Sequence, residues 1–204
     1  LHPAALEGLR QPLEDRVVTI ARVAGTTRFP SDVLLVVAMN PCPCGYAGHA
    51  TIACQCDERA QHRYRRRISG PLADRIDLHV TVGTVALAEL DPAQRPPETA
   101  ALRARVVAAR VQQLERFGAL TAAVNPRRLV SAGGFEREAL ALLRDAAEQL
   151  GLSARGWHRT LRVARTIADL MGAERVDGTA LAEALRYRPT PMSRTLSTTA
   201  HSVA

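Results

Sequence analysis

The feature that most constrains this chain is a pair of apolar segments on either side of a loop rich in cysteine and arginine. The first segment, residues 33–38 (VLLVVA), has no polar residue on either face, which is typical of a strand buried on both sides of a parallel sheet. Asn40 and Pro41 follow, so an amide side chain is expected at the carboxyl end of this strand, where open α/β sheets bind ligands. A second strand is predicted at residues 76–82. The sequence therefore indicates an α/β fold.

Four cysteines follow the first predicted strand as two C-x-C pairs separated by nine residues. Thiolates are favoured ligands of Zn²⁺, and four of them complete its tetrahedral shell without leaving an open position for a substrate. Gly45 and Gly48 allow the loop to double back, so we predict a structural zinc site. Reduced structural cysteines and two disulfides are the alternatives, and His49 is an alternative ligand. The predicted ligands are Cys42, Cys44, Cys54 and Cys56.

Several ordered blocks of the sequence resemble one protein family. They are MNPCPCG, the second C-x-C pair, YRRRISGPLADRID and GLSARGWHRTLRVARTIADL. These blocks are similar to the magnesium-chelatase-like AAA+ ATPases of the YifB/ComM type, and the resemblance covers about residues 1–190. Ala73 stands where this family is expected to have a leucine. A long ordered match of this kind is more specific than any single motif.

The chain contains no nucleotide-binding P-loop. The motif G-x-x-x-x-G-K-[ST] needs a lysine to reach the β- and γ-phosphates, and the sequence has no lysine. In the family that the chain resembles, HPAALEGLRQPLEDR directly follows the acidic pair of Walker B. We therefore interpret the chain, which begins with Leu1, as the C-terminal part of a longer ATPase. By itself it is not expected to hydrolyse ATP.

Two domains are predicted, with a proline-rich linker at residues 91–97 between them. Residues 1–90 are expected to form the C-terminal half of an AAA+ P-loop ATPase core, a parallel sheet with a β-hairpin insert. Residues 98–190 are expected to form an all-α lid domain, followed by a disordered tail at residues 191–204. The predicted helices are residues 2–16, 57–68, 98–117, 135–150, 154–171 and 178–187.

The resemblance implies roles in ATP hydrolysis for three side chains. Asn40 corresponds to sensor 1, which holds the attacking water without becoming charged. Arg75 corresponds to the arginine finger, which one subunit contributes to the ATP bound by its neighbour. A guanidinium suits this role because it is always charged and binds phosphate through two donors. Arg162 corresponds to the sensor 2 arginine of the lid. The alternatives are a turn cap for Asn40 and an ion pair with Asp74 or Asp77 for Arg75. For Arg162 they are Arg155 or Arg159 in the same role, or a solvated charged helix face.

A β-hairpin is predicted from residues 17–23 and 26–29, with a turn at Ala24-Gly25. By resemblance, it is the hairpin that this group of ATPases inserts before sensor 1, which points toward the pore in ring helicases. Arg22 and Arg28 would then contact the phosphate backbone of DNA, independently of sequence and in a salt-sensitive manner. An ordinary edge hairpin is the alternative.

Composition bears on partners and location. The formal net charge of +7 suits a polyanionic partner, either nucleotide or nucleic acid. The arginine bias of a GC-rich genome explains the charge equally well. No segment approaches the roughly 20 apolar residues of a membrane span, so a cytoplasmic location without membrane association is expected.

The function that the resemblance implies is ATP-driven remodelling of DNA by a homo-oligomeric ring, expected to be a hexamer, as in branch migration during natural transformation. ATP with Mg²⁺ would be the cofactor of the complete protein, and Zn²⁺ a structural cofactor of this part. Two rivals stay open. One is a metal-chelatase motor subunit, against which the cysteine loop argues. The other is a non-enzymatic DNA-binding module, in which Arg159, Arg162 and Arg165 would contact phosphate.

Overall fold

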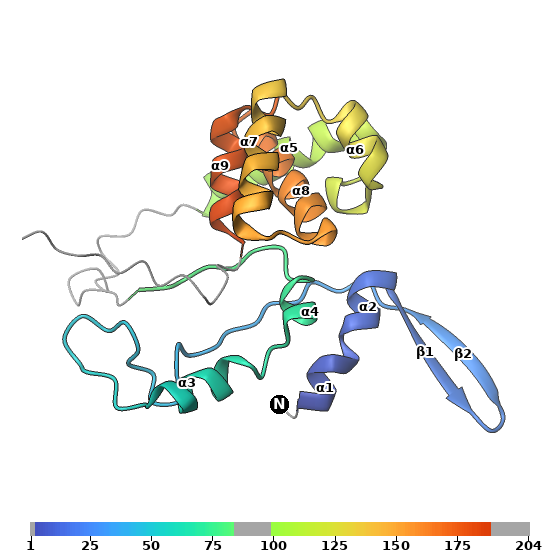
Figure 1. The fold of residues 1–204 in the computed structure, drawn as a ribbon. Coiled ribbons are helices and arrows are strands. Elements are labelled where there is room, and N and C mark those ends of the chain that lie inside the picture. Colours follow the sequence, from blue (N-terminus) through green and yellow to red (C-terminus); the bar gives the residue numbers. More distant parts are fainter. Residues whose placement is uncertain (1–2, 84–98, 189–204) are drawn as a thin grey trace, which may run out of the picture. The chain divides into compact units, whose positions relative to one another are not determined.

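The computed structural model describes residues 3–83 and 99–188, which belong to two compact units divided between Glu98 and Thr99. Figure 1 shows the elements of both units, and each is described here by itself. The predicted linker at residues 91–97 and the predicted tail at residues 191–204 lie outside the described residues.

The N-terminal unit begins with helices α1 (Pro3–Gly8) and α2 (Arg10–Asp15) in place of one predicted helix. Arg16 ends α2 in the left-handed region, at φ 54°, and leads into strands β1 (Val17–Arg22) and β2 (Gly25–Pro30). The two strands pair antiparallel as a hairpin, which confirms the predicted hairpin with its turn moved by one residue.

The predicted parallel sheet is not shown by the structure. Within residues 3–83 and 99–188 the named strands form one two-stranded antiparallel sheet, and residues 33–38 and 76–82 are not strands. A strand needs a neighbour to take up its backbone hydrogen bonds, and no described segment pairs with either stretch. Leu34 and Val36 are consequently 92% and 82% exposed. The described fold is mixed α/β and rich in helix.

Two capped helices follow the cysteine loop. Asp57 caps α3 (Glu58–Arg65), and its carboxylate accepts a hydrogen bond from the Ala60 N–H at 2.5 Å. Ser69 caps the single turn of α4 (Gly70–Ala73) in the same way, through the Leu72 N–H at 3.2 Å. Each cap fixes the residue at which its helix begins.

The C-terminal unit is helical, in agreement with the sequence. Gly118 and Gly151 follow two of its helices with φ of 65° and 64°, a conformation that glycine adopts at little cost. One α-helix was not predicted, although Asn125 and Pro126 are a typical cap and first residue. The elements are α5 (Thr99–Phe117), η3 (Thr121–Ala123), α6 (Pro126–Ala132), α7 (Arg137–Leu150), α8 (Ala154–Leu170) and α9 (Gly178–Arg186).

Helix α8 lies at the centre of this unit. It packs against α5, α6, α9 and η3, and α7 packs against α9 (Figure 1). The apolar stripe of α8 contributes Leu161, Ala164 and Ala168 to the core. The largest other core side chains are Phe117, Leu129, Leu143, Val176 and Leu181.

Candidate functional site

The cysteine loop brings its four thiols together. All four Sγ atoms lie within 4.8 Å of one another, and Cys42 Sγ is 3.3 Å from Cys44 Sγ and 3.6 Å from Cys54 Sγ. Tetrahedral Zn–S bonds of about 2.3 Å place the sulfur atoms about 3.8 Å apart. Cys42 is buried, the other three are half-buried, and all four are free thiols. The donor set and its spacing therefore fit a zinc ion.

Backbone turns hold the two C-x-C pairs in this arrangement. The Gly45 N–H donates to the Cys42 carbonyl at 3.1 Å, and the Ala47 N–H donates to Cys42 Sγ at 3.3 Å. Gly45 and Gly48 have φ of 85° and 81°, so a side chain at either position would strain the loop. The sequence prediction that these glycines let the loop double back is confirmed.

His49 braces the loop. Its Nδ1 accepts hydrogen bonds from the backbone N–H groups of Thr51 and Ile52, at 3.2 and 3.1 Å, and its ring meets the Tyr46 ring edge-on. Among the residues that the structure describes, His49 is not in the metal-binding group, which consists of the four cysteines.

Proton affinities differ within the cluster. Backbone N–H groups of Tyr46 and Gln55 lower the pKa of Cys44 to about 6. A backbone N–H of Cys44 lowers the pKa of Cys56, but the Cys44 side chain and burial outweigh it and raise that pKa to about 12. Metal ligation requires thiolates, so binding of a divalent cation would release the protons that remain on the cluster.

Arg75 is held inside the N-terminal unit. Its Nε donates to the Arg10 carbonyl at 3.1 Å and its Nη1 donates to the Pro71 carbonyl at 2.7 Å. Its Nη2 forms an ion pair with the Glu14 carboxylate, and the side chain is only 10% exposed. Helix α2 thus supplies the carboxylate partner of this arginine.

Asn40 lies beside the cysteine loop. It is exposed, and its Nδ2 is 3.9 Å from the position of a Cβ added to Gly45. The structure therefore places Asn40 beside Gly45 of the cysteine loop, and not at the end of a paired strand.

The two hairpin arginines lie on opposite faces of the hairpin. Arg28 pairs with Thr19 and Arg22 pairs with Gly25. Cross-strand partners share a face and successive residues alternate, so Thr19 and Arg28 are on one face while Arg22 shares the other with Ile20. A single flat surface would not contact both guanidinium groups at once.

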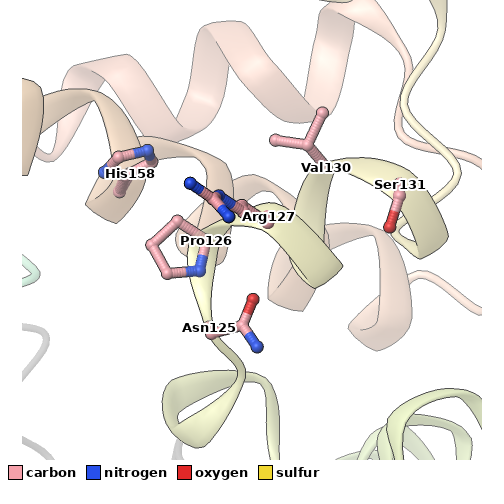
Figure 2. A pocket seen from close by; sticks show the side chains of 6 residues that line it. All are labelled: Asn125, Pro126, Arg127, Val130, Ser131 and His158. Atoms are coloured by element: carbon pink, nitrogen blue, oxygen red, sulfur yellow. The ribbon is translucent and has the colours of Figure 1, made fainter.

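Arg162 belongs to the C-terminal unit and is half-buried there. Its Nη2 donates to the Val124 carbonyl at 3.1 Å. Val124 comes directly before Asn125, which lines an open groove at the start of α6. Figure 2 shows this groove from close by. The groove is lined by Asn125, Pro126, Arg127, Val130, Ser131 and His158, the last of which comes from α8.

Both units match models of one protein family. The model described as magnesium chelatase, subunit ChlI, matches residues 1–90, and the model described as magnesium chelatase, subunit ChlI C-terminal, matches residues 97–188. The chain belongs to the magnesium-chelatase-like family.

This magnesium-chelatase-like chain is 38% identical to the competence protein ComM of Haemophilus influenzae and 35% identical to the uncharacterized protein YifB of Escherichia coli, over 185 residues in each case. These alignments cover 90% of this chain and 36% of each relative. The resemblance to the YifB/ComM type is thus confirmed, and the chain spans little more than a third of the length of these relatives.

Sequence reasoning missed a buried ion network in α8. Arg165 is fully buried and donates to Asp169 Oδ1 from Nε at 3.1 Å, while Arg116 Nη1 reaches the same oxygen at 2.6 Å. Arg165 also donates to three backbone carbonyls, those of Gly133, Ala173 and Glu174. Burial lowers the pKa of Arg165, and the neighbouring Asp169 counteracts it. The i,i+4 spacing of Arg165 and Asp169 was the available signal.

This burial corrects one of the rival interpretations. Arg165 has no exposed surface, so it does not contact DNA phosphate as the binding-module alternative requires.

None of the helices described in residues 3–83 and 99–188 is both long and apolar enough to span a bilayer.

Proposed function

We propose that this chain is the C-terminal part of a magnesium-chelatase-like AAA+ ATPase whose ring remodels DNA. The observation that carries the proposal is the match of both units to one relative, ComM, which is named a competence protein. Uptake and recombination of DNA define competence, so DNA is the proposed partner. ATP and DNA are both present in the cytoplasm, where we place the protein.

ATP binding in this proposal needs residues outside the chain. The sequence has no lysine to contact the β- and γ-phosphates, and the chain spans 36% of ComM. The P-loop and the Mg²⁺ ligands would therefore be supplied by a preceding part of a longer protein. Residues 1–204 would supply groups that act on the bound nucleotide.

Arg75 is proposed as the arginine finger of a homo-oligomeric ring. A guanidinium placed against transferring phosphate stabilises the charge of the transition state, by about 10³–10⁵ in rate in related GTPases. In the single chain Arg75 is paired with Glu14. Insertion into a neighbouring active site would exchange this carboxylate for phosphate oxygens and leave Glu14 to the solvent.

Asn40 and Arg162 are proposed to complete the site as sensor 1 and sensor 2. Asn40 is exposed and uncharged, so its amide is available to orient a water molecule. Arg162 lies on α8, with one guanidinium nitrogen on the carbonyl of Val124, the residue before the groove-lining Asn125. It would contact the γ-phosphate of its own subunit.

A complementation experiment tests the finger. An Arg75→Ala variant of the natural protein that carries this sequence is mixed with a P-loop-lysine variant of the same protein, and ATP hydrolysis is measured. Each variant alone should be inactive, while the mixture should regain activity, because some interfaces join an intact finger to an intact P-loop. Arg103→Ala, on the exposed face of α5, is the matched control and should stay active. A mixture that assembles but stays inactive would contradict the proposal.

The cysteine cluster is proposed as a structural zinc site. Its four thiols would hold the ion and leave no position for a substrate. The natural protein should contain one zinc per chain, which a variant with serine at all four cysteine positions should lack. A metal-free protein that melts at the same temperature as the zinc-loaded one would refute this role.

A metal-chelatase motor subunit is the second candidate, favoured by the description of both matching family models. Stimulation of ATP hydrolysis by DNA separates the two functions. A DNA-remodelling ATPase should be stimulated by DNA, whereas a chelatase motor should not respond to it.

A further inference from the structure

Helix α3 carries a stripe of basic side chains that the proposed ATP site does not use. Residues spaced i, i+3, i+4 and i+7 lie on one face of a helix. In α3 and its C-cap these positions are Arg59, His62, Arg63 and Arg66, and all four are exposed. The described ion pairs leave Arg59, Arg63 and Arg66 without a carboxylate within the described part of the chain.

The opposite face of α3 is attached to the cysteine cluster. Gln61 Nε2 donates to the Cys56 carbonyl at 3.2 Å and lies 3.6 Å from Cys54 Sγ. Ala60, Gln61 and Tyr64 are half-buried on this side. The helix is therefore oriented by the cluster, and its arginine stripe faces outward.

The chemistry of the stripe favours phosphate over a protein surface. Protein interfaces are built around buried apolar and aromatic side chains, and the stripe contains only cationic residues and His62. Binding to a nucleic-acid backbone needs little more than positive charge at the right spacing.

The length of the stripe also matches a duplex. From Arg59 to Arg66 the helix rises about 10 Å. One strand of B-DNA presents a phosphate about every 3.4 Å along the axis, so about three phosphates lie alongside three arginines. A nucleotide would occupy only part of such a stripe.

We propose that Arg59, Arg63 and Arg66 form a second DNA-backbone contact, held in place by the cysteine cluster. Figure 1 shows α3 and the β1–β2 hairpin as separate parts of the N-terminal unit, with α3 beside the cysteine loop. The inference rests on the proposed function, which makes DNA the polyanionic partner. It places a DNA contact on α3, in addition to the contact predicted from the sequence for Arg22 and Arg28 of the hairpin.

The test is the salt dependence of DNA binding by the natural protein that carries this sequence. Binding of a 30-base-pair duplex is measured at several salt concentrations for the wild type and for R59Q/R63Q/R66Q. Each phosphate contact contributes about 0.9 to the slope of log K against log salt, so three lost contacts lower the slope by about 2.7. Between about 50 and 200 mM salt, the wild type should then lose about 40-fold more affinity than the variant.

Matched variants separate this contact from general charge. R103Q/R105Q/R110Q removes the same charge from the exposed face of α5 and should keep the wild-type slope. R59K/R63K/R66K keeps the charge and should restore the slope, which guards against misfolding of the glutamine variant. ATP hydrolysis without DNA should be equal in all of them.

The failing outcomes are distinct. This inference would be overturned by an α3 glutamine variant that keeps the wild-type slope, or by an α5 variant that loses as much slope as the α3 variant. If R22Q/R28Q weakened DNA binding in the same experiment, the proposed function would still hold. If the α3 variant kept its DNA affinity but lost binding to a poly-glutamate peptide, the stripe would serve an acidic protein and the inference would be wrong. A wild type that binds no DNA would refute both proposals.

Discussion

Removal of the Asp169 carboxylate should strongly destabilise the C-terminal unit. Its side chain has no exposed surface, and its Oδ1 accepts hydrogen bonds from Arg165 Nε at 3.1 Å and from Arg116 Nη1 at 2.6 Å. The same oxygen forms an ion pair with Arg165 Nη2 at 2.9 Å. Asp169→Ala leaves the Arg165 cation buried beside three carbonyls without its counter-charge. Loss of one member of a buried pair costs about 3–5 kcal/mol. For a domain of this size each kcal/mol lowers Tm by about 4–8 °C, so the fall should exceed about 12 °C.

Trp157 provides the assay. It is the single tryptophan of the chain and packs against the core around α8, so its fluorescence during urea unfolding reports on this unit. The control is Asp145→Ala, an exposed carboxylate on α7, which should change stability by no more than about 0.5 kcal/mol. The double variant Arg165→Met, Asp169→Leu removes both charges but should regain only part of the loss, because the carbonyls of Gly133, Ala173 and Glu174 then lose their donor. A loss below about 1 kcal/mol for Asp169→Ala would refute this account of the network.

Three further predictions concern local geometry. A hydrogen bond with Ser69 lowers the pKa of Glu7 from its usual value. This shift stabilises the fold above the unfolded pKa, and the stabilisation is lost as pH falls through the folded pKa. Ser69→Ala should therefore raise the Glu7 midpoint in an NMR titration, and an unchanged midpoint would contradict it. Asn125→Ala removes the α6 cap and should cost about 1 kcal/mol in urea unfolding, whereas Asn125→Asp should cost much less. Gly134 has φ 68°, and an added Cβ would lie 3.1 Å from a carbonyl oxygen. Gly134→Ala should therefore lose more stability than Gly172→Ala, which has φ 71° and open space around it.

Much of the cysteine site could be read from the sequence, because its determinants are local. The two C-x-C pairs and the glycines between them lie within 15 residues, Cys42 to Cys56. Short turns of fixed geometry then decide where the thiols meet. The Asp57 cap is local in the same sense, since it bonds a backbone N–H three residues away.

The environments of the arginines depended on tertiary structure. Arg75 meets Glu14 across 61 residues of sequence, and Arg116 meets Asp169 across 53. The helical pattern of α8 places Arg165 among charged residues, where exposure is expected. Packing of α8 against α5 and α9 nevertheless buries its side chain completely. No local rule ranks one arginine of this arginine-rich chain above another as an ion-pair partner.

The sequence alone determined the family resemblance, the helices of the C-terminal unit other than α6, the hairpin and the candidate metal ligands, because each depends on spacing over a few residues. It predicted strands at residues 33–38 and 76–82 from their apolar character, and neither is a strand in the described structure. Apolar character expresses a preference for burial, whereas a strand also needs a neighbouring backbone to bond. Only the tertiary structure decides whether that neighbour is present, and which charged side chains find a partner in the core.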